Sequence, residues 1–89
     1  MERIEVFYCG HVQGVGFRYN ACEQADGLAV TGWVQNLPDR RVQMVAEGSI
    51  GDLKELLRRI DRSMSGNIRD KSVAWQSATG QLAPFQIKR

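Results

Sequence analysis

The sequence predicts an α+β sandwich in which two helices pack on one face of an antiparallel sheet. Short segments of alternating apolar residues and two segments of helical periodicity follow one another in the order strand, helix, strand, strand, helix, strand. The chain has 89 residues, 43% of them apolar, which suffices for one hydrophobic core and is below the length at which chains usually divide. We therefore expect a single domain over residues 1–89.

The first predicted strand leads into a glycine-rich loop and then into a helix. Residues 3–8 alternate in the manner of a half-buried strand. The residues expected on its buried face are Ile4, Val6 and Tyr8. After Arg18 the spacing becomes helical, and one face of this helix is formed by Ala21, Ala25 and Leu28. Gly27 is expected to weaken the last turn, because glycine costs a helix about 1 kcal/mol relative to alanine.

The next two strands are predicted to form a hairpin. They cover residues 30–36 and 41–47, and Leu37-Pro38-Asp39-Arg40 lies between them. This connection has turn chemistry, since proline fixes φ and an aspartate side chain can accept a hydrogen bond from its own backbone. A connection this short makes the two strands antiparallel neighbours.

The second predicted helix has the clearest amphipathic pattern in the chain. Ser49 can cap its start, with Asp52 completing a capping box. Its apolar stripe consists of Leu53, Leu56, Leu57, Ile60 and Met64. Strands at residues 72–76 and 84–88 complete the chain, and Pro84 places the last one at a sheet edge. This order of elements is that of a ferredoxin-like βαββαβ sandwich.

The glycine-rich loop carries the residues with the clearest chemistry. Gly10, Gly14 and Gly16 allow backbone N–H groups to point into one concavity, and the following helix adds the positive end of its dipole. Arg18 stands where the loop becomes a helix. Its planar guanidinium can bind two phosphate oxygens at once and stays charged at any working pH. The sequence therefore predicts a phosphate-binding cradle anchored by Arg18.

Other phosphate and metal chemistries lack the residues that they need. No lysine followed by serine or threonine comes after the glycines, and Tyr19 stands where a dinucleotide fingerprint needs its third glycine. Cys9 is too far from Arg18 in sequence to be the nucleophile of a cysteine-dependent phosphatase. His11 is the only histidine, and no cluster of residues has metal-ligand spacing. We expect an exposed His11, and neither a metal nor a cofactor.

Charge and hydropathy limit the kinds of partner that the protein is expected to bind. The net charge is only +2 and the basic residues are dispersed, so no nucleic-acid partner is expected. No apolar run approaches the roughly 20 residues that cross a bilayer, so we expect no membrane partner and a location in the cytoplasm. We also expect a monomer. Cys9 and Cys22 are expected to be reduced thiols, and the sequence leaves a bridge between them open.

Two motifs resemble the signature pair of the acylphosphatase family. The first is Gly10-His11-Val12-Gln13-Gly14-Val15-Gly16-Phe17-Arg18, and the second is Gly32-Trp33-Val34-Gln35-Asn36. The similarity covers nearly the whole chain and includes Val45-Ala46-Glu47-Gly48 and the closing Phe85-Gln86-Ile87.

The resemblance implies metal-free hydrolysis of a small-molecule acyl phosphate to a carboxylate and inorganic phosphate. It makes Arg18 the catalytic arginine and Asn36 the residue that positions the attacking water. It also implies a phosphate-binding loop made of Gln13, Gly14, Val15, Gly16, Phe17 and Arg18. Because the conjugate acid of the leaving carboxylate has a pKa of about 4, such a reaction needs no general acid.

Two departures from the family pattern leave local structure open. Asp39-Arg40 replaces the usual Asp-Gly, so either the turn type differs or Arg40 carries about 1 kcal/mol of strain at a positive φ. Residues 65–70 replace the usual Gly-Pro, which leaves open a longer loop there.

Two other functions also stay open on the sequence. The same fold can serve as a non-catalytic module that binds a phosphorylated metabolite. RNA-recognition motifs share the order of elements, although residues 41–47 contain no aromatic side chain for base stacking.

Overall fold

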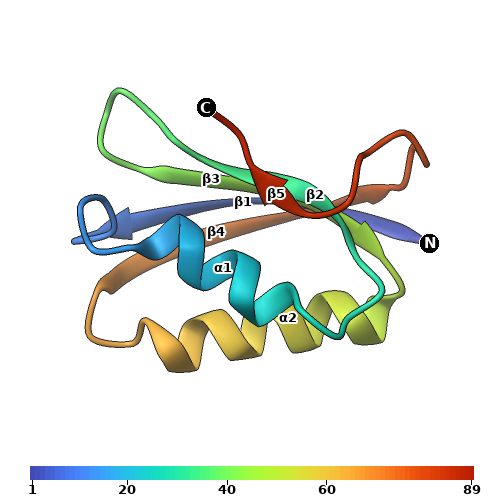
Figure 1. Cartoon of the computed structure of the whole chain (residues 1–89), viewed down its shortest axis with the longest axis horizontal. Coiled ribbons are helices and arrows are strands. Elements are labelled where there is room, and N and C mark those ends of the chain that lie inside the picture. Colours follow the sequence, from blue (N-terminus) through green and yellow to red (C-terminus); the bar gives the residue numbers. More distant parts are fainter.

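The computed structural model describes all residues from 1 to 89 and consists of two layers, a five-stranded sheet and a pair of helices (Figure 1). The strand order in the sheet is β4-β1-β3-β2-β5. Both helices lie on the same face of the sheet, as predicted. The elements are β1 (Glu2–Gly10), α1 (Phe17–Ala25), β2 (Thr31–Asn36), β3 (Val42–Gly48), α2 (Ile50–Ser63), β4 (Ile68–Ser77) and β5 (Gln86–Ile87).

The sheet is antiparallel across its four longer strands. β1 lies between β3 and β4 and is antiparallel to both, and β2 is antiparallel to β3. The short β5 pairs in parallel with β2, with Trp33 opposite Gln86, so the complete sheet is mixed. The parallel pair arises because residues 78–85 carry the chain from the β4 side of the sheet to its opposite edge, where it resumes the direction of β2.

One hydrophobic core fills the space between the sheet and the helices. The alternation in β1 buries Ile4, Val6 and Tyr8 completely, as the sequence predicts. The helical stripe of α2 meets them with Leu53, Leu56 and Ile60, which are equally inaccessible. The Ser49 hydroxyl accepts a hydrogen bond from the Asp52 N–H and caps α2, also as predicted.

Several boundaries differ from the predicted ones. α1 begins at Phe17 and ends at Ala25, so Gly27 lies beyond the helix, with φ 81°. β4 starts at Ile68 rather than at residue 72, because β1 continues to pair with it as far as Gly10. The connection after α2 is therefore short. The final strand is reduced to two residues, and Pro84 makes only an isolated bridge to Thr31.

The sequence left open two geometries for the hairpin turn, and the structure has the one in which Arg40 is strained. Arg40 has φ 75°, and it is the only residue other than glycine with a positive φ. The Asp39 carboxylate accepts hydrogen bonds from the Arg41 backbone N–H and guanidinium, which stabilise the turn and lower the pKa of Asp39.

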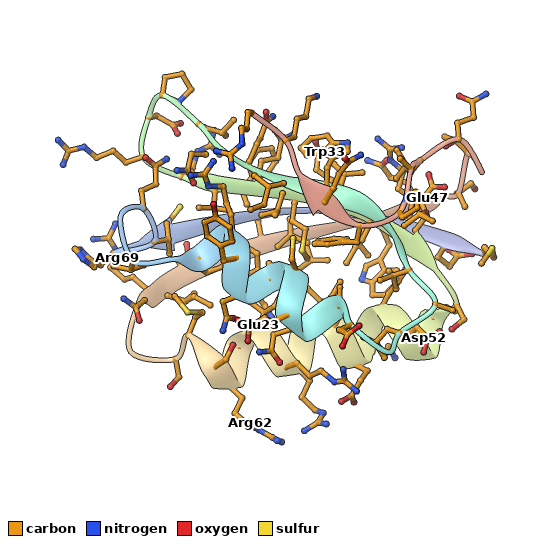
Figure 2. All side chains as sticks on the ribbon, in the orientation of Figure 1. Glu23, Trp33, Glu47, Asp52, Arg62 and Arg69 are labelled. Carbon is orange, nitrogen blue, oxygen red and sulfur yellow. The ribbon has the colours of Figure 1, made fainter.

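A buried carboxylate fastens the segment that follows β4. Glu47, on β3, accepts hydrogen bonds from the Thr79 and Gly80 N–H groups, the Thr79 hydroxyl and Arg3 (Figure 2). Burial alone would raise the pKa of Glu47, but these hydrogen bonds outweigh it and lower the pKa to about 2. Neither helix has the length and hydropathy needed to span a bilayer.

Candidate active site

The loop between β1 and α1 is the centre of the candidate site. Gly14 and Gly16 both have φ 76°, a conformation that favours glycine. Gly16 is also the residue before the first turn of α1, and no side chain caps that turn. The first N–H groups of a helix have no partner within the helix. The loop therefore delivers uncapped amide donors and the positive end of α1 to one place.

The loop is fastened to the rest of the fold at two points. The Gln13 side-chain amide donates to the carbonyl oxygens of Leu37 and Arg41, at 2.8 and 2.9 Å, and so ties the loop to the β2–β3 hairpin. The His11 N–H donates to the Asn67 carbonyl oxygen at 3.0 Å, and the Asn67 amide donates back to the His11 carbonyl oxygen. These bonds hold the loop in place without using the amides near Gly16.

Asn36 reaches the same place from the sheet. It is the last residue of β2 and pairs with Val42, so its side chain lies on the helix-facing side together with that of Val34. The Asn36 Oδ1 atom is buried and accepts no hydrogen bond from the protein. A buried acceptor without a partner is costly, so this atom is set up to accept a bond from something that enters the site.

A small cavity brings the loop and Asn36 together. It has a volume of about 110 Å³. Its lining consists of Val12, Gly14, Gly16, Phe17, Arg18, Tyr19 and Asn36. The Arg18 side chain makes no hydrogen bond or ion pair within the protein, so its charge is free for a ligand. The Phe17 ring anchors the start of α1 in the core, where it packs against Tyr8 with ring centroids 4.8 Å apart.

The residues named from the sequence fall into two groups. Gly14, Gly16, Phe17, Arg18 and Asn36 line the cavity together. The other two loop residues do not line it: the Gln13 side chain is committed to the hairpin, and Val15 is partly buried against the core.

Two cavity residues were not among the sequence-predicted site residues. Val12 is buried beneath the loop and Tyr19 is exposed at its edge. The sequence signal for Tyr19 is its place directly after Arg18 in the first turn of a helix, but the loop conformation decides which face of that turn meets the cavity.

The cavity has the chemistry of an anion site. It combines a guanidinium, uncapped helix amides and an amide oxygen, and no carboxylate, imidazole or thiol is part of its lining. Elsewhere, no group of three or more histidine, cysteine or acidic side chains is arranged to hold a metal. Cys9 and Cys22 are not bridged, and His11 is exposed, as expected.

Comparison with known proteins gives a consistent result. The family model described as Acylphosphatase matches residues 4–87. An acylphosphatase from Rubrobacter xylanophilus is 51% identical over 88 residues, which cover 98% of this chain and 80% of that protein. One from Trichormus variabilis is 41% identical over 88 residues, covering 98% of this chain and 86% of that protein.

Solved structures show the same fold. The crystal structure of acylphosphatase from Bacillus subtilis superposes with a TM-score of 0.89 at 30% identity and covers 100% of both chains. The structure of an acylphosphatase from Coxiella burnetii gives a TM-score of 0.75 at 28% identity, covering 98% of this chain and 93% of that one.

Proposed function

Because this chain belongs to the acylphosphatase family, and is therefore a hydrolase of acyl phosphates, we propose that Arg18 and the loop amides hold the phosphoryl group while Asn36 positions the attacking water. The cavity lining supports this division of roles, since it places the guanidinium and the loop beside the Asn36 side chain. The loop contributes through the backbone of residues 13–17, of which Gly14, Gly16 and Phe17 line the cavity.

The leaving group explains why so few side chains are needed. A carboxylate departs without protonation, because its conjugate acid has a pKa of about 4. Catalysis then consists of orienting the phosphoryl group, stabilising its oxygens and aligning a water for in-line attack. Arg18 and the amides perform the first two tasks. A phosphoryl oxygen of the substrate accepts the proton from the water, so no protein base is required.

The observation that carries the proposal is the unpartnered, buried Oδ1 atom of Asn36. An amide oxygen accepts a hydrogen bond and donates none. A water that donates to this atom is held in place while its own lone pair stays free for attack on phosphorus. An asparagine that merely ended a strand would not need its oxygen kept from both solvent and protein donors.

We also propose that the reaction needs no metal and that the enzyme works as a monomer in the cytoplasm. The positive charge that a metal would supply comes from Arg18 and the helix amides, and the cavity offers none of the carboxylate oxygens that Mg²⁺ prefers. The two unbridged cysteines suit a reducing compartment.

Phosphate release from benzoyl phosphate tests the proposal. The comparison uses the parent protein, Arg18→Ala, Asn36→Ala and the matched control Arg62→Ala, each with and without a chelator. Arg62 is an exposed residue near the end of α2, and its side chain lies away from the loop (Figure 2). We expect kcat/KM to fall by about 10²–10³ in each site variant, as for loss of a preorganised transition-state contact.

The remaining outcomes of the assay separate the parts of the proposal. The chelator should leave turnover unchanged, and Arg62→Ala should match the parent protein. Parental activity in Arg18→Ala would refute the role of the guanidinium. Loss of turnover with the chelator would refute the metal-free reaction.

A further inference from the structure

A larger and more open groove lies beside the cavity that contains Arg18, and Tyr19 lines both. The groove runs along one flank of α1 and has a volume of about 500 Å³. It is lined by Tyr19, Cys22, Glu23 and Asp26, which lie three or four residues apart and so share one face of the helix. Because Tyr19 lines both hollows, the groove is next to the cavity.

The small cavity cannot contain the whole substrate. The cavity has a volume of only about 110 Å³, so we place the phosphoryl group and the water in it and the acyl group outside it. The buried Asn36 oxygen places the water at the inner end. The attacking and leaving oxygens of phosphoryl transfer lie roughly in line, so the acyl group leaves at the outer end, where Tyr19 is 60% exposed.

The charges along the groove have a definite order. The positive groups stand at the cavity end: Arg18 in the cavity, and Arg89, which donates to the Tyr19 hydroxyl at 3.4 Å. The negative groups, Glu23 and Asp26, stand farther along α1. From the helix rise Glu23 lies about 7.5 Å from Arg18 along the axis, and Asp26, the first residue after α1, lies beyond it. Glu23 is exposed, and its side chain lies beside α1 (Figure 2).

The two carboxylates are free to meet a ligand. Neither the Glu23 nor the Asp26 side chain takes part in an ion pair or hydrogen bond. The nearest guanidinium recorded beside them, that of Arg59, bonds the carbonyl oxygens of Gln24 and Asp26 and is itself paired with Glu55. Between the two charged ends, Cys22 is neutral, because burial raises the pKa of its thiol.

From this order of charges we infer that the α1 groove is the binding site for the acyl part of the substrate and favours acyl groups that carry an ammonium group. The inference rests on the proposed function, because it takes the position of the phosphoryl group from it. An acyl phosphate with an amino group has the same polarity as the surface: its phosphate lies at Arg18 and its ammonium group reaches Glu23 and Asp26. The Tyr19 ring packs against the chain between them.

Selectivity between two substrates tests the inference. The probes are para-toluoyl phosphate, which is neutral in its acyl part, and para-(aminomethyl)benzoyl phosphate, which carries an ammonium group. The measured quantity is the ratio of their kcat/KM values in each protein. Any difference in leaving-group reactivity is the same for every variant and cancels when the ratios are compared.

The ratio should respond to the groove carboxylates alone. For the double variant Glu23→Gln/Asp26→Asn we expect the ratio of the ammonium to the neutral substrate to fall about three- to tenfold, as for exposed charge pairs. The matched control is Glu2→Gln, which removes one negative charge at the start of β1, far from the loop. It should keep the parental ratio. Raising the ionic strength should lower the ratio in the parent protein and not in the double variant.

The outcomes separate the inference from the proposed function. If the parent hydrolyses para-toluoyl phosphate and the double variant keeps the parental ratio, the groove inference is wrong and the proposed function stands. If folded parent protein hydrolyses neither probe, both are wrong. Melting temperatures of the variants confirm that they are folded, and no side-chain bond is lost in either groove substitution.

Discussion

At the scale of single residues, the proposed function gives different roles to two side chains. Arg18 brings a charge that nothing in the protein neutralises, and Asn36 brings a buried oxygen that nothing in the protein satisfies. The first is suited to bind the phosphoryl group in every state, and the second is suited to orient a water. Removal of the two side chains should therefore change different properties of the enzyme, namely its phosphate affinity or its kcat.

Inhibition by inorganic phosphate reveals this difference. In Arg18→Ala the phosphate inhibition constant should rise at least about tenfold, because a charged hydrogen bond contributes about 1.5–3 kcal/mol. In Asn36→Ala the constant should stay within about twofold while kcat falls, because the amide contacts the water and not the phosphate. Equal losses of phosphate affinity in both variants would contradict the assignment of roles.

A third residue, Gln13, supports the loop from behind. Its amide donates to two hairpin carbonyl oxygens, Leu37 O and Arg41 O. Gln13→Ala should lower the free energy of unfolding by about 1–2 kcal/mol, since it leaves two part-buried acceptors without this donor. Urea unfolding measures the change. The matched control is Gln81→Ala, a substitution at an exposed side chain that makes no hydrogen bond, and it should have little effect.

The sequence singled out Arg18 from the glycine-rich loop before it, and it singled out Asn36 only from the resemblance of its motif to that of a known family. It could not predict the contributions of Gln13 and Tyr19. The first depends on how far the hairpin folds back over the loop, and the second on which face of the first helical turn meets the cavity. Both are properties of tertiary packing rather than of spacing along the chain.

At the scale of elements, the hairpin turn contains strain that one substitution can relieve. Arg40 has φ 75°, a conformation costing a side-chain-bearing residue about 1–2 kcal/mol. Arg40→Gly should raise the free energy of unfolding by about 0.5–1 kcal/mol, after allowance for the greater freedom of glycine in the unfolded chain.

A second arginine supplies the control for that prediction. Arg62→Gly places glycine within α2, where it should cost about 1 kcal/mol. Denaturant unfolding of both variants measures the change in the free energy of unfolding, which should be positive for Arg40→Gly and negative for Arg62→Gly. A destabilised Arg40→Gly would mean that the turn is not strained.

The strands show why pattern and pairing can disagree. Residues 68–71 contain little apolar alternation, so the sequence does not indicate a strand there. They form part of β4 because the backbone N–H and C=O groups along the edge of β1 need partners, and β4 supplies them. The reverse holds for residues 84–88, which alternate well but find a partner strand only at Gln86 and Ile87. The α2 stripe, in contrast, was predicted residue by residue because a helix makes its hydrogen bonds internally.

At the scale of the whole molecule, Glu47 joins three parts of the fold. It lies on β3, pairs with Arg3 of β1 at 3.2 Å and accepts bonds from Thr79 and Gly80 in the segment leading to β5. Its side chain is only 3% exposed. The carboxylate therefore couples its ionisation to the folding of the entire sheet.

That coupling predicts how the free energy of unfolding depends on pH in the acid range. The pKa of Glu47 is about 2 in the folded protein, below the ordinary value of 4.5. Its contribution is therefore complete above the higher value and is lost as the pH falls toward the lower one. In Glu47→Gln the free energy of unfolding at pH 7 should fall by about 2 kcal/mol, and it should depend less on pH in the acid range. An unchanged dependence on pH in the acid range would contradict this role for Glu47.

The two-layer arrangement was predictable because each element already shows which of its faces is apolar. How the two layers come together to form the site was less predictable from the sequence. Only the family resemblance implied that the end of β2 and the start of α1 meet around one site; residue spacing does not show it, because that meeting depends on the register of β2 against β3.

The most direct test of the account is the fate of solvent oxygen. In the proposed mechanism the cavity holds the phosphoryl group and Asn36 holds the water, so the water should attack phosphorus and not the acyl carbon. Hydrolysis of benzoyl phosphate in water enriched in the heavy oxygen isotope, analysed by mass spectrometry, distinguishes the two sites of attack. The account predicts that the label appears in inorganic phosphate and not in benzoate, and label in benzoate would contradict it.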